Sequence, residues 1–496
     1  MVFGRRVHIH CVLFVGHHIF SIMSSLSDEI VSAVDDIQPE AIDFLKTIVA
    51  IDSTLDKGEG EVQHTILNLL QEALGSGVDS SGTKRKQPNC FDVSTIPVVL
   101  DKIKDKRGFS PVDWNYDESK FNVVASYQGC SSDGSEGNRK ALLLQGHVDV
   151  VPANESDGWT HPPFSPIIKD GRMYGRGSGD MKAGVVAMIY AVIALRRMGY
   201  LPRTNVTICT VIEEECTGNG ALAANHTSLL PFSDTTKTAV IIPEPFHFIV
   251  NAQMGVLWFN AKITGKPCHV LQTSAGSNAI EGAFSLFAAL KALEEKYNEQ
   301  DNIHPAYRGV DHPVNFNLGK IEGGDWASSV PSSCRFEARV GFWPGIAIED
   351  VKRDIENTLN EEANKLGLGL EIAYRGFHAD GAVLLPDFVD GEASGKKSLQ
   401  TDFVDSLQKC YKIASTDGES KAGRQLAMGP LTCTCDARFY SNLYQNPDNV
   451  VVTCFGPESD SIHGVDESVS LKSFRDCMVT MALFIEEWCG LEKEET

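Results

Sequence analysis

The sequence has 496 residues, of which 42% are hydrophobic and 22% charged, a composition typical of a soluble globular protein with more than one core. The formal net charge of −22 argues against nucleic acid as a partner, because such a surface repels a polyanion. The 13 cysteines include no CxxC pair, so we expect no disulfide framework and no structural zinc knuckle, and reduced cysteines indicate a cytoplasmic protein.

Residues 1–22 carry an Arg pair and a short apolar stretch that His17 and His18 interrupt. The stretch is too short and too polar to cross a bilayer, and we expect no membrane span elsewhere in the chain. Two interpretations of this segment stay open. It is a mitochondrial presequence, as the absence of acidic residues before Asp28 indicates, or it is an extension upstream of a start at Met23.

The section 23–253 predicts the first part of an α/β domain. Apolar residues at three- and four-residue spacing predict helices up to residue 75, and a polar, loop-rich section follows to residue 139. The next predicted elements are a strand at 140–152, a helix at 181–200 and strands at 205–215 and 238–245. Polar residues follow each strand, and sheets of this kind bind ligands at the carboxyl ends of their strands.

Between residues 254 and 376 the predicted order is strand, helix, two strands and a second helix. This order indicates a small α+β domain inserted into the larger one. The α/β pattern resumes over residues 377–496, which end in a predicted helix at 471–488. The predicted fold is therefore a two-domain α/β protein whose larger domain contains a mixed sheet.

Candidate metal ligands lie at or just beyond the predicted strand ends. They are His147, Asp180, Glu215, Glu244 and His463. Alone, a histidine in an apolar strand is more often a core residue, and an aspartate before a helix is more often an N-cap. Together, two imidazoles and three carboxylates, one of them bridging, can complete two zinc sites and leave room for water.

Several motifs occur in a characteristic order and spacing. They are "LLLQGHVDVVP", "DGRMYGRGSGDMKAG", "EEECTGNGA", "PEP" and "HGVDES". This set resembles the family of di-zinc amidohydrolases and exopeptidases that includes acetylornithine deacetylase, succinyl-diaminopimelate desuccinylase, aminoacylase and carboxypeptidase G. The resemblance covers nearly the whole chain from Met23 and implies a catalytic α/β domain with an inserted, ferredoxin-like dimerisation or lid domain.

The resemblance implies two Zn²⁺ ions per chain, which Co²⁺ could replace. Asp180 would bridge both metals, with His147 and Glu244 completing one site and Glu215 and His463 the other. A further implication is a cis peptide bond between Asp180 and the residue after it.

The resemblance also implies roles around these ligands. Asp149 would accept a hydrogen bond from the ring of His147 and fix its tautomer. Counting back from Gly220 makes Glu215 the metal ligand and Glu214 the general base, while Glu213 receives no catalytic role.

His269, in "ITGKPCHV", matches a family histidine that is donated across a dimer interface to polarise the scissile carbonyl. From the residue alone, an ordinary surface histidine is the simpler interpretation. With the resemblance, we expect a homodimer formed through the inserted domain.

The substrate side departs from the family pattern. Gly341 stands where relatives place the arginine that binds a substrate carboxylate, and Arg339 on the same strand face could substitute. Ser328 is nearest to a missing asparagine, and Gly456 either presents its backbone to substrate or is an ordinary turn glycine. Whether the substrate has a free carboxylate stays open.

These observations predict a zinc-dependent amidohydrolase that cleaves the amide bond of a small N-acylated amino acid or amine, as acetylornithine deacetylase does. A metallo-exopeptidase that cleaves dipeptides or a carboxy-terminal residue is the alternative. A catalytically inactive binding protein is a remote third possibility, which the presence of all five ligands and Glu214 disfavours.

Overall fold

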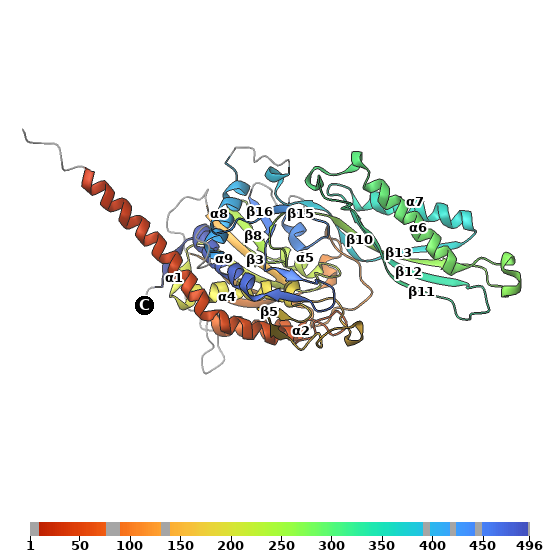
Figure 1. The fold of residues 1–496 in the computed structure, drawn as a ribbon, viewed down its shortest axis with the longest axis horizontal. Coiled ribbons are helices and arrows are strands. Elements are labelled where there is room, and N and C mark those ends of the chain that lie inside the picture. Colours follow the sequence, from red (N-terminus) through yellow and green to blue (C-terminus); the bar gives the residue numbers. More distant parts are fainter. Residues whose placement is uncertain are drawn as a thin grey trace, which may run out of the picture.

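The structure is a computed structural model that describes residues 9–75, 90–129, 139–389, 397–416, 423–441 and 449–494, with the side chains described from residue 26 onward. No side chain of residues 1–22 is among those described, so the structure tests neither interpretation of this segment. Figure 1 shows a larger domain that contains most of the helices and a smaller domain at the opposite end of the molecule, coloured green to cyan.

The larger domain is built on a six-stranded mixed sheet in the order β1-β2-β7-β3-β8-β16. The strands are β1 (Asp92–Pro97), β2 (Phe121–Tyr127), β3 (Arg139–His147), β7 (Asn205–Val211), β8 (Thr236–Ile242) and β16 (Val450–Cys454). Strands β7, β3, β8 and β16 run parallel, whereas β1 and β2 pair antiparallel. The carboxyl ends of β3, β7 and β8 consequently meet at one edge of the sheet.

The helices of this domain are α1 (Ile9–Val49), α2 (Gly60–Ala73), α3 (Leu100–Ile103), α4 (Ala183–Arg197), α5 (Asn219–Asn225), α8 (Leu399–Ala414) and α9 (Leu471–Cys489). Helices α4 and α9 contact each other and β3, and α1 and α8 pack against them. Strand β3 is apolar in its middle, where Leu142, Leu143 and Leu144 are fully buried, as expected for a strand inside a covered sheet.

The segment Ser178–Arg197 is long and apolar enough to cross a membrane, judged by length and composition alone. Its mean hydropathy comes from many small and β-branched residues rather than from an unbroken run of large ones. Of its most apolar window, 94% is buried inside the protein, as in the core helix of a globular domain. No other helix in the described ranges passes the same test.

The loop-rich section before residue 139 contains more regular structure than predicted. Strand β1 and the short helix α3 both lie in it. Strand β1 was missed because it is a short edge strand whose exposed, polar positions interrupt the apolar ones.

The smaller domain comprises β10 (Gly255–Thr264), α6 (Ala279–Tyr297), β11 (Phe316–Gly323), β12 (Ser333–Phe342), α7 (Ile348–Leu366) and β13 (Gly369–Ala379). The strands pair antiparallel in the order β11-β12-β10-β13, which is the ferredoxin-like arrangement. Helices α6 and α7 cover this sheet (Figure 1). Strand β13 continues past the predicted domain boundary at residue 376.

Helix α7 shows why these residues form a covering helix. Its buried residues recur every four positions at Val351, Ile355, Leu359 and Ala363, which places one apolar stripe against the sheet.

Short strands complete the larger domain in three small sheets. They are β4 (Ile167–Lys169), β5 (Arg172–Tyr174), β6 (Tyr200–Pro202), β9 (Ile249–Gln253), β14 (Ala382–Val383), β15 (Met428–Leu431), β17 (Ser459–Asp460), β18 (Ser468–Ser470) and β19 (Leu491–Lys493). Strands β9 and β14 flank the points where the chain enters and leaves the smaller domain.

Candidate metal centre

The five candidate ligands come from separate segments and meet at the carboxyl edge of the central sheet. His147 ends β3, Glu215 lies in the turn after β7, and Glu244 follows β8. Asp180 lies in the turn that leads into α4, and His463 lies in the loop between β17 and β18. The edge position follows from the parallel strands, which deliver their following residues to the same side of the sheet.

These side chains form two groups that share one residue. One consists of His147, Asp180 and Glu244, the other of Asp180, Glu215 and His463, and within each group the ligand atoms lie within 4.8 Å of one another. His147 Nε2 is 3.2 Å from Asp180 Oδ1, whereas His463 Nε2 is 3.3 Å from Asp180 Oδ2. The two oxygens of Asp180 therefore face different imidazoles, which is the geometry of a bridging carboxylate.

The outer carboxylates complete the two groups. Glu244 Oε2 lies 3.8 Å from His147 Nε2, and Glu215 Oε2 lies 3.0 Å from His463 Nε2. His147 is buried, whereas the side chain of His463 is about half exposed, with a fraction of 51%. The second group is thus the more open of the two. The peptide bond between Asp180 and Met181 is cis, as the resemblance implied.

The ionisation of this cluster is governed by burial and by the two imidazoles. Burial raises the pKa of Glu214 and of Glu244 well above the usual range. Burial also opposes ionisation of Asp180, but hydrogen bonds from the rings of His147 and His463 outweigh it and lower its pKa. The carboxylate of Glu215 is the main cause that raises the pKa of His463 to about 11.

The residues present fit divalent cations. Imidazole nitrogens and carboxylate oxygens are the donors that zinc and similar metals prefer. Glu214 Oε1 and Glu244 Oε1 are buried and have no hydrogen-bond partner among the described residues. Such oxygens are costly to bury unless a cation or a polar group satisfies them.

Asp149 acts on both the histidine and the glutamates. The ring Nδ1 of His147 is 3.0 Å from the backbone oxygen of Asp149 and 3.5 Å from its Oδ1. The carboxylate accepts hydrogen bonds from the backbone N–H groups of Glu214, at 3.1 Å, and Glu215, at 2.9 Å. The ring of His147 thus contacts the backbone oxygen of Asp149 as well as the predicted carboxylate. The hydrogen bonds from Glu214 and Glu215 to Asp149 were not predicted.

The three glutamates lie in a turn beyond β7, so they do not alternate along a strand. Glu215 belongs to a ligand group, whereas Glu214 belongs to neither, and its Oε2 lies 4.0 Å from His147 Nε2. Glu213 is fully buried and has a left-handed backbone with φ of 60°. Its side chain makes hydrogen bonds away from the ligand groups.

Glu467 supports the bridging position and was not predicted to do so. Its Oε1 accepts hydrogen bonds from the backbone N–H groups of Gly179, at 2.9 Å, and Asp180, at 3.0 Å, and its other oxygen pairs with Arg176. The sequence could have indicated this role, because Glu467 belongs to the "HGVDES" motif that contains His463.

Arg339 lies close to the position predicted for the missing arginine. Its Nη1 donates to the backbone oxygen of Asn315 at 3.1 Å, and a Cβ built at Gly341 would lie 3.4 Å from that same Nη1. Burial raises the pKa of the Cys433 thiol. The positive charge of Arg339 opposes this rise, and the carboxylate of Glu214 adds to it.

Gly456 packs against the strand end that carries Glu244. A Cβ at Gly456 would lie 2.1 Å from the backbone oxygen of Glu244, so only glycine fits there. Its N–H donates to the backbone oxygen of Phe246 at 3.0 Å, and its own oxygen lies 3.0 Å from His247 Nδ1. Both backbone groups are already paired, which supports the packing interpretation over presentation to substrate.

His269 and Ser328 are both exposed on the smaller domain, and neither belongs to the two ligand groups found among the described residues. Their segments lie side by side, because His269 pairs with Ser329 in an isolated antiparallel bridge. The ring of His269 accepts a hydrogen bond from the backbone N–H of Leu271 at 3.2 Å. Within one chain, His269 is thus not brought to the metal cluster.

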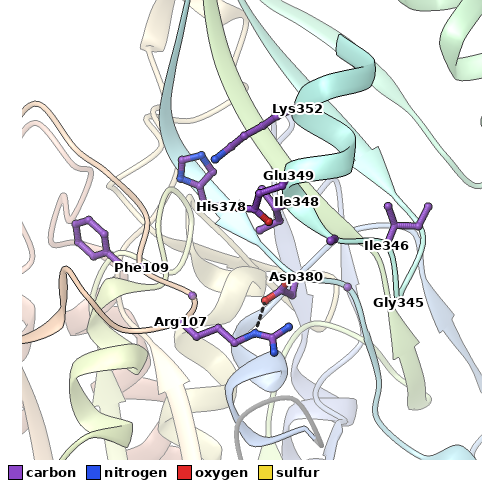
Figure 2. Close-up of a pocket in the computed structure, with 12 residues that line it drawn as sticks. Arg107, Phe109, Gly345, Ile346, Ile348, Glu349, Lys352, His378 and Asp380 are labelled. Carbon is purple, nitrogen blue, oxygen red and sulfur yellow. Dashed lines mark hydrogen bonds and ion pairs between the residues drawn. The ribbon is translucent and has the colours of Figure 1, made fainter. Parts of the chain in front are cut away.

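A separate pocket of about 410 Å³ lies where the two domains meet (Figure 2). Arg107 and Phe109 line it from the larger domain, and Glu349, Lys352 and His378 from the smaller one. None of the five candidate ligands lines this pocket.

Comparison with known proteins identifies the family. A model described as peptidase family M20/M25/M40 matches residues 143–487, more than half of the chain. The chain is 27% identical over 373 residues to a probable succinyl-diaminopimelate desuccinylase of Staphylococcus aureus, covering 71% of this chain and 82% of that protein. It is 25% identical over 412 residues to the N-formyl-4-amino-5-aminomethyl-2-methylpyrimidine deformylase of Bacillus subtilis, covering 78% and 88%.

The fold is similar to that of the dipeptidase Dug1p of Saccharomyces cerevisiae, with a TM-score of 0.66, 15% identity, and coverage of 93% of this chain and 98% of that one. The predicted fold class and the resemblance are both confirmed. The chain belongs to peptidase family M20/M25/M40, whose members are metal-dependent hydrolases of amide bonds, typically with two metal ions.

Proposed function

We propose that this protein is a zinc-dependent amidohydrolase that removes the acyl group from a small N-acylated amino acid or amine. The observation that carries the proposal is the pair of ligand groups sharing Asp180, with Glu214 beside them and outside both. The relatives named as a desuccinylase and a deformylase support an N-acyl substrate.

In this proposal the two metal ions, when bound, supply Lewis acidity and positive charge. His147, Asp180 and Glu244 would hold one ion, and Asp180, Glu215 and His463 the other. Co²⁺ could replace Zn²⁺, because both suit the same nitrogen and oxygen ligands.

Glu214 is the proposed general base. It takes a proton from water as the water oxygen bonds to the amide carbon, and it delivers that proton to the nitrogen as the C–N bond breaks. The products are a carboxylic acid and an amine. Support comes from its burial beside His147 and from Oε1, which has no partner among the described residues.

Arg339 is the proposed contact for a substrate carboxylate. Its Nη1 lies 3.4 Å from the position that a Cβ at Gly341 would take, so its guanidinium lies beside the position where relatives place the arginine. A guanidinium can bind a carboxylate through two parallel hydrogen bonds. Ser328, exposed on the same domain, is the weaker candidate for this side of the site.

We also propose a homodimer formed through the smaller domain. Leu271, Phe284 and Trp326 expose 85%, 60% and 72% of their surface on this domain. Large exposed apolar residues of this kind often mark protein interfaces. In the dimer, the partner's His269 would reach the active site and polarise the scissile carbonyl, a task that His269 does not perform within its own chain.

A metallo-exopeptidase is the second candidate, because Arg339 suits the free carboxylate of a dipeptide as well as that of an N-acyl amino acid. The similarity of the fold to that of a dipeptidase supports this candidate. The two candidates have the same metals and differ in the leaving group.

A substrate panel on the zinc-loaded protein separates them. N-acetyl, N-formyl and N-succinyl amino acids are compared with dipeptides at equal concentration, and kcat/KM is measured for each. We expect the highest kcat/KM for an N-acyl compound. Higher values for all dipeptides would favour the exopeptidase, and no hydrolysis of either class would contradict both.

A further inference from the structure

We propose that Glu213 is a positioning residue whose buried carboxylate holds the turn that carries Glu214 and Glu215. This inference rests on the proposed function, since it concerns the placement of the general base. We call Glu213 and the four side chains that bind its carboxylate the glutamate anchor. The four are Trp114, Tyr116, Lys120 and Thr217.

Each carboxylate oxygen of Glu213 is contacted by two side chains. Trp114 Nε1 donates to Oε1 at 3.0 Å, and Lys120 Nζ lies 2.9 Å from the same oxygen. The hydroxyl of Tyr116 donates to Oε2, as does Thr217 Oγ1 at 3.0 Å. With no exposure to solvent, each of these bonds is made in a low-dielectric interior where it constrains the side chain strongly.

The backbone of Glu213 is fixed as well as its side chain. Its carbonyl oxygen accepts hydrogen bonds from the N–H groups of Thr217, at 3.1 Å, and Gly218, at 2.7 Å. Its left-handed backbone, with φ of 60°, is uncommon for a residue other than glycine and needs such surrounding support. The anchor therefore fixes one end of the turn.

Asp149 fixes the same turn from the metal side. Its two carboxylate oxygens accept the N–H groups of Glu214 and Glu215, next to His147. The turn is thus held between a carboxylate that faces the metal centre and a carboxylate that faces away from it. Glu214 has little freedom to move between them.

The segment that precedes Trp114 and Tyr116 contacts the smaller domain. Trp114 and Tyr116 follow a segment that runs along β13, where the N–H of Gly376 donates to the backbone oxygen of Pro111 at 2.9 Å. Ser110 Oγ accepts from the N–H of His378 at 3.1 Å and donates to the backbone oxygen of Thr217 at 2.8 Å. Figure 2 shows the start of this segment, where Arg107 pairs with Asp380.

This arrangement predicts a catalytic effect because general-base transfer depends on distance. A misplacement of about 1 Å at a reacting group can cost about 100-fold in rate. Removing one donor lets the Glu213 side chain shift, and the adjoining Glu214 shifts with it. A purely structural network would instead lower stability and leave the turnover of the folded protein unchanged.

The test uses Tyr116→Phe, Trp114→Phe and the double variant, which leave Glu213 and Lys120 in place. Tyr297→Phe is the matched control, because it removes a phenol-to-carboxylate bond of 2.9 Å to Asp354 in the smaller domain. Steady-state kinetics, zinc content and Tm are measured for each variant.

We expect kcat to fall about tenfold in each single variant and about 100-fold in the double variant, with KM and zinc content unchanged. The control should retain the kcat of the wild type. A wild-type kcat in the double variant, or a loss that follows the loss of zinc, would overturn the inference.

Glu214→Gln distinguishes this inference from the proposed function. If Glu214→Gln is as active as the wild type, the proposed base is wrong and the anchor has no base to position. If Glu214→Gln is inactive while the double anchor variant keeps its turnover, only the anchor is wrong. A crystal structure of Tyr116→Phe gives a readout independent of turnover: we expect a displaced or doubled Glu214 side chain, and an unmoved one contradicts the inference.

Discussion

The adjacent glutamates Glu214 and Glu215 should respond in opposite ways to the same substitution. Glu215 Oε2 lies 3.0 Å from His463 Nε2 and belongs to a ligand group, whereas Glu214 belongs to neither. Replacing Glu214 with Gln keeps the shape of the side chain and removes its ability to accept a proton. We therefore expect Glu214→Gln to retain the metals and Glu215→Gln to bind them more weakly.

The expected size of the effect follows from the role. General acid–base assistance contributes about 10²- to 10⁴-fold to rate, which is about 3 to 5 kcal/mol of activation free energy. Glu214→Gln should lose about this much kcat, with little change in KM. Glu215→Gln should lose activity together with metal, and excess zinc should restore part of it.

The assay combines metal analysis after dialysis with steady-state kinetics on the preferred substrate of the panel. Both variants are compared with the wild type at the same free zinc concentration. The opposite pattern, metal loss in Glu214→Gln and full metal content in Glu215→Gln, would mean that the two roles are exchanged. Wild-type turnover in Glu214→Gln would refute the assignment of the base.

Burial raises the pKa of Glu59 to about 7, although the ion pair with Lys120 opposes this. Its folded pKa exceeds the ordinary value of 4.5, so its contribution to stability is present at low pH and is lost as pH rises to about 7. Glu59→Gln should reduce the fall in Tm between about pH 5 and pH 8, and an unchanged Tm profile would contradict this. His269→Ala should lower kcat without unfolding, and mixing it with Glu214→Gln chains should restore some activity if the histidine acts across a dimer; no recovery on subunit exchange would argue against that. Arg339→Met should raise KM for substrates with a free carboxylate more than for matched amides, whereas an equal change for both would exclude a carboxylate contact.

The sequence predicted the candidate ligands because each one lies at or near the end of a regular element. His147 and Glu244 lie at the ends of apolar strands, and parallel strands bring such positions together without further information. The ferredoxin-like order of the smaller domain could be expected from the resemblance and from its alternating strands and amphipathic helices.

The supports of the site could not be predicted in the same way. Trp114, Tyr116 and Lys120 lie in a loop-rich section about one hundred residues before Glu213 and carry no periodic pattern. Only the folded chain shows that they converge on one buried carboxylate. Likewise, the paired backbone groups of Gly456 depend on tertiary contacts that no local pattern encodes.

If the proposed function is right, two metal ions bound by these ligands are required for amide hydrolysis. The most direct measurement is the metal content of the purified protein, followed by turnover before and after chelation and after zinc is added back. We expect about two zinc ions per chain, loss of turnover on chelation and recovery with zinc. A metal-free preparation that retains full turnover would contradict a metal-dependent mechanism.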